Sequence, residues 1–304
     1  MNGIAAVILC AGKGTRMNDE STNKVCFPVN GVPALQRTIN NMIKAGITRF
    51  VVVVGHKSEK VMECLSSYEG IAYAYQSVQN GTGNAALAGL RVLDKLGYEG
   101  PALISMGDKI ISEDVISALI ERYHHSRAKT VFAVQPKEFN PDGGRIVSRE
   151  GRVCGIYEMT DSCILALGAL ENQTPDEYER TLDTLRINEK KKKKILAYAN
   201  AHIGKLPSCA VLRDESFTYD EIEASRYVNT ATYLCDVSLT LSAIGSLDSD
   251  NAQGEIYLTD AVNMMIRSGG VDTLPINSKE KMLTFATKEE LASISKYFAD
   301  KERK

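Results

Sequence analysis

The first 135 residues alternate short apolar runs with longer amphipathic stretches, and few folds accommodate that alternation. The apolar runs are rich in valine and isoleucine, as buried parallel strands are. The amphipathic stretches predict helices, the first of which starts at Pro33 and ends before Gly46. Strands alternating with helices indicate an α/β fold with a doubly wound, mostly parallel sheet. We predict strands over 4–9, 50–54, 71–75, 102–105 and 131–134, and helices over 33–45, 58–66, 83–96 and 113–123.

The pattern changes beyond residue 143. Two short runs, 145–147 and 152–156, flank Glu150-Gly151 and predict a hairpin. Residues 161–226 differ in composition, with a helix start at Pro175 and five consecutive lysines, Lys190 to Lys194. We therefore predict one domain over 1–160 and 227–304, interrupted by a mainly helical insertion over 161–226. Within that domain we expect a further strand over 227–234 and helices over 255–267 and 287–298.

Composition excludes several classes of protein. The 36 Lys and Arg residues nearly balance the 38 Asp and Glu residues, for a net charge of −2. A general nucleic-acid binder would carry a basic surface, so we expect no nucleic-acid partner. No apolar run approaches the roughly 20 residues of a membrane span. The seven cysteines are scattered without a CxxC pair, which favours a reducing, cytoplasmic location. The oligomeric state stays open, a homo-oligomer included.

The strongest local motif is LCAGKGTRM at residues 9–17, directly after the first strand. Gly12 and Gly14 let the backbone approach a bulky anion, and Arg16 can bind two phosphate oxygens at once. Met17 stands where a dinucleotide-binding GxGxxG motif has its third glycine. The motif therefore favours a phosphate site of another kind, with an ordinary strand-to-helix turn as the alternative. Lys24 could add a second positive charge at the same place.

Polar residues also follow the later strands. Gln76 comes after the third strand, and NGTGNA at 80–85 opens a helix whose N-terminus suits an anion or a carbonyl group. Helix capping by Asn80 or Thr82 is the alternative. Asp108 follows the strand at 102–105, a position suited to a Mg²⁺ ligand, although it could instead cap the next helix.

Two asparagines complete the set of candidates. Asn251, in the loop NAQGE at 251–255, could give a neutral oxygen to a metal. Asn229 falls inside a predicted strand, where a buried side-chain amide needs partners. A ligand hydroxyl bound by Asn229 would explain its place there.

Together these segments resemble the sugar-1-phosphate nucleotidyltransferases, and within that family the uridylyltransferase domain that makes UDP-N-acetylglucosamine. The matching motifs cover most of the chain outside 161–226. They occur in the family's order: LCAGKGTRM at 9–17, Lys24-Val25, Gln76 with GTGNA at 81–85, Gly107-Asp108, Gly144-Arg145-Ile146, Gly155 to Glu158, Asn229-Thr230, and NAQGE at 251–255 with Tyr257 and Thr259-Asp260.

The resemblance implies a Rossmann-like nucleotide-diphospho-sugar transferase fold. It also implies a Mg²⁺-dependent reaction of UTP with N-acetylglucosamine-1-phosphate that releases pyrophosphate. The residues implied are Leu9, Ala11, Gly12, Gly14, Gln76, Gly81 and Thr82 for the nucleotide; Arg16 and Lys24 for the phosphates; Gly144, Glu158 and Asn229 for the sugar; and Asp108 and Asn251 for the metal.

Some residues depart from the family pattern. Cys10 replaces an alanine, Met106 replaces an aromatic residue, and Met159 replaces a charged residue after Glu158. The stretch 161–226 is foreign to the pattern, and we expect its lysine run on a solvated surface, with a phosphate or lipid contact as the alternative. The acetyltransferase domain with hexapeptide repeats, which follows in the bifunctional enzymes, is missing, so acetyl transfer is not expected.

Two other hypotheses stay open. The chain could use glucose-1-phosphate or another sugar or alcohol phosphate, with UTP or dTTP as the nucleotide. It could also be a regulatory protein that binds nucleotide sugars without turnover.

Overall fold

A computed structural model describes residues 3–14, 17, 21–185, 187–247 and 254–303. Its centre is a nine-stranded sheet. The five strands predicted from the N-terminal alternation all belong to it. The sheet consists of β1 (Ala5–Leu9), β4 (Arg49–Val54), β5 (Ile71–Tyr75), β6 (Pro101–Met106), β8 (Thr130–Pro136), β9 (Arg145–Arg149), β10 (Arg152–Tyr157), β13 (Tyr227–Asp236) and β14 (Val271–Pro275).

The sheet is mostly parallel, as predicted. Strands β6, β1, β4 and β5 are parallel neighbours, with Leu9 of β1 opposite Val53 of β4 and Met106 of β6. Strand β13 is antiparallel to β6, β8 and β9, and β14 is parallel to β8. Because β10 is antiparallel to β9, two of the nine strands, β13 and β10, run against the rest.

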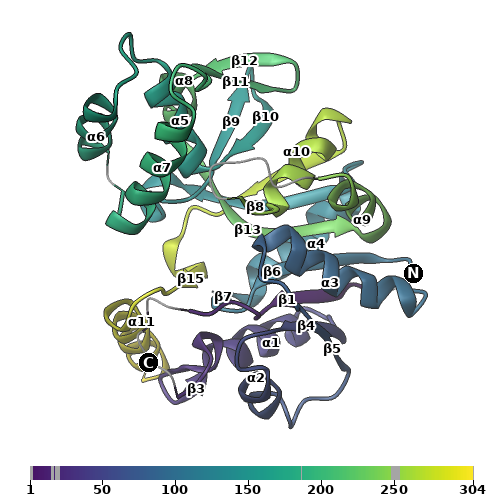
Figure 1. Ribbon diagram of the computed structural model, residues 1–304. Helices are drawn as coiled ribbons and strands as arrows, with labels where there is room; N and C mark the ends of the chain where they lie inside the picture. The colour runs from purple at the N-terminus through teal and green to yellow at the C-terminus, as the bar shows by residue number, and fades with distance from the viewer. Residues whose placement is uncertain (1–2, 15–16, 18–20, 186, 248–253, 304) are drawn as a thin grey trace.

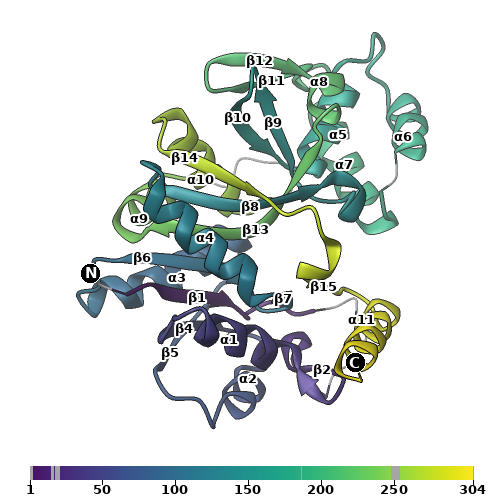
Figure 2. The same cartoon turned by 180° about the vertical axis from the view of Figure 1, so that it is seen from behind.

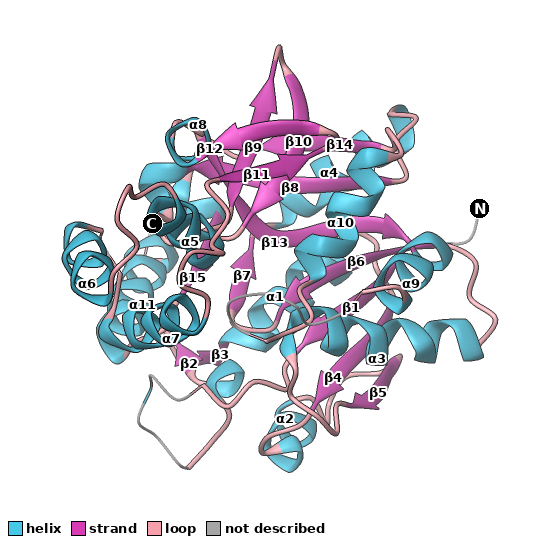
Figure 3. Cartoon of the chain, turned by 45° about the horizontal axis from the view of Figure 1, so that its top comes forward, coloured by secondary structure: helices cyan, strands magenta, loops and turns pink. Residues whose placement is uncertain are grey.

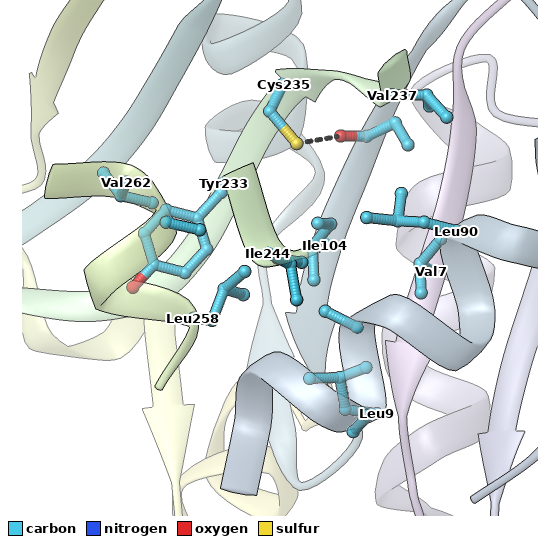
Figure 4. Close-up of a cluster of buried hydrophobic side chains, with 14 of the residues drawn as sticks. Val7, Leu9, Leu90, Ile104, Tyr233, Cys235, Val237, Ile244, Leu258 and Val262 are labelled. Atoms are coloured by element: carbon cyan, nitrogen blue, oxygen red, sulfur yellow. Dashed lines mark hydrogen bonds between the residues drawn. The ribbon is translucent and has the colours of Figure 1, made fainter. Parts of the chain in front are cut away.

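Helices cover both faces of the sheet, which makes the fold doubly wound (Figures 1 and 2). One face packs against α1 (Ala34–Lys44), α2 (Ser58–Cys64) and α4 (Glu113–His125). The other packs against α3 (Gly81–Lys95), α9 (Val237–Gly245) and α10 (Leu258–Arg267). Successive side chains of β1 alternate between these cores: Ala6 and Ile8 enter the first, Val7 and Leu9 the second (Figure 4).

Residues 161–226 fold into helices and one hairpin beside β9 and β10, at the upper left of Figure 1. Tyr178, Leu182 and Ile195 are fully buried in a separate apolar core there. Met159, a departure from the family pattern, packs into this core. The elements are α5 (Met159–Gly168), α6 (Pro175–Thr184), α7 (Glu189–Ala201), β11 (Cys209–Leu212), β12 (Glu215–Thr218) and α8 (Tyr219–Glu223). The domain boundaries at 160/161 and 226/227 stay predictions.

Several elements were not predicted from the sequence. Strands β7 (Lys109–Ile111) and β15 (Met282–Thr284) are too short to show a period, and they pair only with each other. The hairpins β2 (Pro28–Val29) with β3 (Val32–Pro33) and β11 with β12, strand β14 and helix α9 were also missed. The closing helix α11 (Lys288–Glu302) lies beside β15 at the end of the sheet opposite the N-terminus (Figure 3).

The helix expected over 255–267 begins only at Leu258, because Ile256 instead bonds to the loop at 80–83. Among the described residues, no helix combines the length and the apolar character needed to cross a bilayer.

Candidate active site

The predicted residues Gly12, Gln76 and Asp108 lie on loops at the carboxyl ends of parallel strands. The backbone N–H of Gly107, after β6, donates to Leu9 O at the end of β1 over 2.9 Å. The N–H of Gln76, after β5, donates to Val54 O at the end of β4 over 2.8 Å. The loops that follow neighbouring parallel strands all begin at the same edge of the sheet, the one formed by the carboxyl ends of the strands. Open α/β sheets bind their ligands at this edge. This edge therefore brings together the loops of Gly12, Gln76 and Asp108.

The loop after β1 is fixed at one side and open at the other. Ala11 O accepts hydrogen bonds from Gln79 Nε2 at 2.7 Å and from His56 N at 3.3 Å. Among the described residues, no heavy atom would lie within 4 Å of a Cβ on Gly12, so space for a ligand adjoins this backbone. Gly14 has φ +58°, and a Cβ there would lie 2.8 Å from Lys24 Cβ. Arg16, also in this loop, lies outside the described residues.

Lys24 and Asp108, 84 positions apart, form an ion pair between Nζ and Oδ2. Their side chains are 11% and 21% exposed, and Lys24 Nζ lies 5.3 Å from the centre of the Phe285 ring. Asn23 holds the turn of Lys24 by donating from Nδ2 to His56 O over 2.7 Å. Asp108 does not cap α4, since Ser112 occupies that position.

Two neighbours shape the surroundings of Asp108. Cys10 is buried, and a Cβ on Gly107 would lie 2.4 Å from its sulfur, so Gly107 makes room for the larger side chain. Burial and the nearby Asp108 raise the pKa of Cys10 well above its ordinary value. Lys109 was not singled out from the sequence; burial lowers its pKa to about 8, while Asp108 opposes the shift and Lys24 adds to it. Two lysines thus adjoin one carboxylate.

The Asp108 carboxylate fits a Mg²⁺ ion that phosphates share. Mg²⁺ takes one or two protein carboxylates and leaves its remaining positions to water and substrate phosphates. The described residues contain no group of three or more His, Cys, Asp or Glu that could hold a metal alone. Asp108 uses Oδ2 for Lys24, and its other oxygen takes no part in that pair. The second predicted ligand, Asn251, lies outside the described residues.

The loop before α3 packs against residues 256–258. Gly81 has φ +89°, and a Cβ on it would lie 2.4 Å from Ile256 O. Gly83 N donates to the same oxygen over 2.8 Å. Thr82 Oγ1 accepts from Leu258 N at 3.1 Å, and no side-chain cap bond starts α3. Gly81 and Gly83 are therefore required for the close packing of this loop against Ile256. The sequence had not suggested this role for them.

The side-chain amide nitrogen of Gln76 is hydrogen-bonded within the protein. Its Nε2 donates to Gly81 O over 3.3 Å and to Asn84 Oδ1 over 3.0 Å. Its side chain is almost fully buried. The amide is thus held in one orientation, with Nε2 rather than Oε1 bound to the protein loop.

A second group, the Glu158 cluster, consists of the predicted residues Gly144, Glu158 and Asn229 together with Thr259, which was not predicted as a site residue. Asn229 N donates to Gly144 O over 2.7 Å. A Cβ on Gly144 would lie 3.3 Å from Glu158 Oε2, and Thr259 Oγ1 donates to Glu158 Oε1 over 2.9 Å. Residues 256–259 therefore bind both the loop of Thr82 and Glu158, and so connect the two groups.

The side chain of Asn229 is satisfied within the protein. Its Nδ2 donates to Tyr233 Oη over 2.5 Å, and its Oδ1 accepts from Ala231 N at 3.0 Å. Ala231 has φ +52°, and the register of β13 against β8 shifts between Asn229 and Tyr233. A bulge thus explains the buried asparagine without a ligand hydroxyl.

Glu158 is expected to lower the stability of the fold at neutral pH. Burial raises the pKa of its carboxyl, against the hydrogen bond from Thr259 and the charges of Lys191 and Arg145. A carboxyl whose pKa is raised by folding disfavours the folded state as pH rises from its unfolded value of about 4.5 through its folded value. Glu158→Gln should therefore melt at a higher temperature than the wild type at pH 7.5.

This advantage should shrink as the pH falls toward 4.5, in melting curves recorded from pH 4 to 8. A variant less stable than the wild type at pH 7.5 would show that the ionised carboxylate stabilises the fold.

Arg145 and Glu223 tie the segment 161–226 to the loop of Gly144. Arg145 donates from Nε and Nη2 to the two oxygens of Glu223 over 2.8 and 2.9 Å. Its Nη1 donates to Pro141 O and Gly143 O over 2.7 and 2.6 Å. Ser162 Oγ also donates to Glu223, over 3.0 Å. A side chain from α8 thus fixes a loop that belongs to the sheet.

The lysine run is not wholly on a solvated face, contrary to our expectation. Lys190, Lys193 and Lys194 are exposed. Lys192 is buried and pairs with Asp183 of α6. Lys191 Nζ lies 3.6 Å from Asp142 Oδ2, and Lys194 Nζ lies 3.9 Å from Glu255 Oε1. Two of the lysines therefore face loops that adjoin the Glu158 cluster.

Of two cavities in the described structure, one lies far from the predicted residues and the other borders Glu158. One, of about 360 Å³, is lined by Arg49, Gly70 and Tyr98, at the opposite edge of the sheet. The other, of about 380 Å³, is lined in part by Glu158 and Asp161. We place the candidate site by the carboxyl ends of the strands, where the loops carrying polar side chains converge.

Comparison with known proteins shows the family. The sequence model of the MobA-like NTP transferase domain matches residues 6–212. The chain belongs to this nucleotidyltransferase family. The matched range includes β1, the loop of Gly12, Asp108 and most of the segment 161–226.

Curated relatives of this MobA-like domain carry the name bifunctional protein GlmU. That of Geotalea uraniireducens is 31% identical over 265 residues, which cover 86% of this chain and 45% of that protein. That of Acetivibrio thermocellus is 28% identical and covers 96% of this chain and 51% of that protein. The chain thus spans about half the length of the curated relatives it matches.

A solved structure from Bacillus anthracis, assigned as a glucose-1-phosphate thymidylyltransferase, shares the fold. Its TM-score is 0.65 at 17% identity, and the match covers 97% of this chain and 94% of that one. At that identity the likeness establishes the fold and leaves the substrates open.

Proposed function

We propose that the chain transfers UMP from UTP to a sugar 1-phosphate, N-acetylglucosamine-1-phosphate in the first place, and releases pyrophosphate. The observation that carries the proposal is the connection through residues 256–259. Leu258 N binds Thr82 Oγ1, and Thr259 Oγ1 binds Glu158 Oε1. A nucleotide at the loops of Gly12, Gln76 and Thr82 would then lie next to a sugar at Glu158. The motif order and the GlmU relatives support the same pairing.

Residues in different loops would bind different parts of the two substrates. The backbone of Leu9, Ala11, Gly12 and Gly14 would hold the phosphates, and Gln76 with Gly81 would contact the base. Glu158 and Gly144 would bind the sugar, and Asn229, whose backbone N–H donates to Gly144 O, would hold the Gly144 loop in position. Arg16 keeps the phosphate role that the resemblance implies.

The reaction needs no protein nucleophile. A phosphate oxygen of the sugar phosphate would attack the α-phosphorus of UTP, and the bond to the pyrophosphate oxygen would break. The protein's task is to align the two phosphates and to balance their charge. Lys24, 11% exposed and held by Asn23 and Asp108, would bind phosphate oxygens.

Asp108 would hold a Mg²⁺ ion together with the substrate phosphates, with Asn251 as the second ligand implied by the resemblance. Bound there, the ion would supply positive charge to the phosphates. Lys24 and Lys109 would set the charge around the Asp108 carboxylate.

A second candidate keeps the reaction and changes the substrates. Met106 stands where the family has an aromatic residue, and the B. anthracis structure bears the name of a thymidylyltransferase acting on glucose-1-phosphate. Glucose-1-phosphate with UTP or dTTP is therefore the alternative pair. A protein that binds UDP-sugars without turnover is a third candidate, disfavoured by the Lys24–Asp108 pair.

One assay separates these candidates. Pyrophosphate release is measured with Mg²⁺ for UTP, dTTP, CTP and GTP, each with N-acetylglucosamine-1-phosphate and glucose-1-phosphate. We expect the highest kcat/KM for UTP with the N-acetylated sugar. Preference for another pair would replace the substrates, and tight UDP-sugar binding with no release of pyrophosphate would point to the regulatory protein.

A further inference from the structure

The lysine-rich helix α7 reaches the proposed sugar site from outside the sheet. In Figures 1 and 2, α7 lies on the same side of the molecule as β7 and β15, where the carboxyl ends of β1 and β6 point. Lys191 Nζ lies 3.6 Å from Asp142 Oδ2, two residues before Gly144. Gly144 in turn adjoins the Glu158 carboxylate. Lys191 therefore contacts the loop whose Gly144 adjoins Glu158.

The positive charges of Lys191 and Arg145 lower the pKa of Glu158, against the larger effect of burial. Arg145 is 6% exposed and uses all three of its guanidinium nitrogens for Glu223, Pro141 O and Gly143 O. Four of its five N–H donors are thus bound within the protein. The Lys191 side chain is 31% exposed, and its ammonium has three donors for one carboxylate at 3.6 Å.

The neighbouring lysines differ from Lys191 in what they face. Lys192 points back into the segment, to Asp183 and Glu179. Lys194, one turn from Lys191, lies 3.9 Å from Glu255, just before the segment that binds Thr82 and Glu158. The face of α7 that carries Lys191 and Lys194 therefore spans the two loops at the Glu158 cluster, although Lys194 is exposed. Lys190 and Lys193 are also exposed, and neither forms an ion pair with another described residue.

We propose that Lys191 is a further acceptor-binding residue, and that the acceptor it selects presents uncharged hydroxyl groups to Glu158 and Lys191. A carboxylate accepts hydrogen bonds from hydroxyls, and an ammonium donates to their oxygens. The phosphate ester of a polyhydroxylated sugar satisfies both groups. A phosphate ester with a cationic head, such as phosphocholine, would suit Glu158 alone and be repelled by Lys191. This inference rests on the proposed function and deepens it.

The test compares Lys191→Gln with Lys190→Gln and Lys193→Gln, which remove the same charge from the same helix. KM is measured separately for UTP and for the preferred sugar 1-phosphate, by pyrophosphate release in the full chain. We expect Lys191→Gln to raise the KM for the sugar phosphate about tenfold or more. Its KM for UTP should change less than twofold, both control variants should match the wild type, and Lys191→Arg should recover most of the loss.

Each contrary outcome has its own meaning. An active wild type with Lys191→Gln equal to Lys190→Gln would overturn this inference and leave the proposed function standing. Equal increases in both KM values would indicate a general structural effect and also overturn it. A wild type that uses phosphocholine better than any sugar phosphate would contradict the acceptor class. A wild type silent with every pair would remove the proposed function, and this inference with it.

Discussion

Asp108→Asn is expected to reduce the rate of pyrophosphate release by on the order of 10³-fold. The substitution removes the charge of the one carboxylate that the described residues place at the end of β6 beside Lys24. It would weaken the hold on Mg²⁺ and would leave the Lys24 ammonium, 11% exposed, without its partner. The rate is measured at saturating UTP and sugar phosphate over a range of Mg²⁺ concentrations.

Asp114→Asn serves as the matched control. Asp114 also follows β6 and pairs with a lysine, Lys281 at 2.6 Å, but both side chains are about half exposed. This variant should keep the wild-type rate. Circular dichroism of both variants would establish that they fold. A folded Asp108→Asn protein with near-normal turnover would refute the role of Asp108.

Glu223→Ala is expected to destabilise the fold by about 3 kcal/mol. Arg145 is 6% exposed and would lose the carboxylate that binds its Nε and Nη2, so a buried positive charge would remain unpaired. Urea unfolding at pH 7 measures the loss. Asp272→Asn is the control, because Asp272 pairs with a half-exposed Arg122 and such pairs contribute about 0–1 kcal/mol.

The effect of Glu223→Ala should depend on pH in a definite direction. Burial alone would raise the pKa of Glu223, but its bonds to Arg145 and Ser162 hold the pKa below the ordinary value of 4.5. A carboxyl with a lowered folded pKa stabilises the protein above about pH 4.5 and loses that contribution as the pH falls further. The gap between wild type and variant should therefore narrow below pH 4.5. Equal losses for Glu223→Ala and Asp272→Asn at pH 7 would contradict the prediction.

Glu223→Ala should also impair binding at the proposed sugar site. Arg145 also binds Pro141 O and Gly143 O, so the loop that carries Gly144 depends on Glu223 for its position. We expect the KM for the sugar phosphate to rise in Glu223→Ala more than the KM for UTP.

The alternation of Val- and Ile-rich runs with amphipathic stretches was sufficient to predict the doubly wound sheet. It could do so because a strand covered by helices on both faces must be apolar at every position, as Ala5–Leu9 is. Three-residue strands such as Lys109–Ile111 carry no such pattern, and they were missed. The bulge at Ala231 was missed for a related reason, since an alanine with φ +52° has no signature in the sequence.

Some residues of the candidate site could likewise be predicted from the sequence and others could not. Lys24, Gln76 and Asp108 could be named from the sequence because each follows a predicted strand or the first loop. Gln79, Asn23 and Thr259 hold those loops in place, but their partners are far along the chain, as with Gln79 and Ala11 at 68 positions. Lys109 could have been suspected, since a lysine directly follows the candidate metal ligand.

The sequence by itself determined the fold class, the edge of the sheet that carries the loops, and the family, because local periodicity and short motifs specify them. Only the tertiary structure decided what the segment 161–226 does to the site. The lysine run reads as a solvated surface in sequence, yet packing of α7 against α5 and α6 turns Lys191 and Lys194 toward Asp142 and Glu255. Contacts between residues this far apart depend on how helices pack, and no local pattern encodes that.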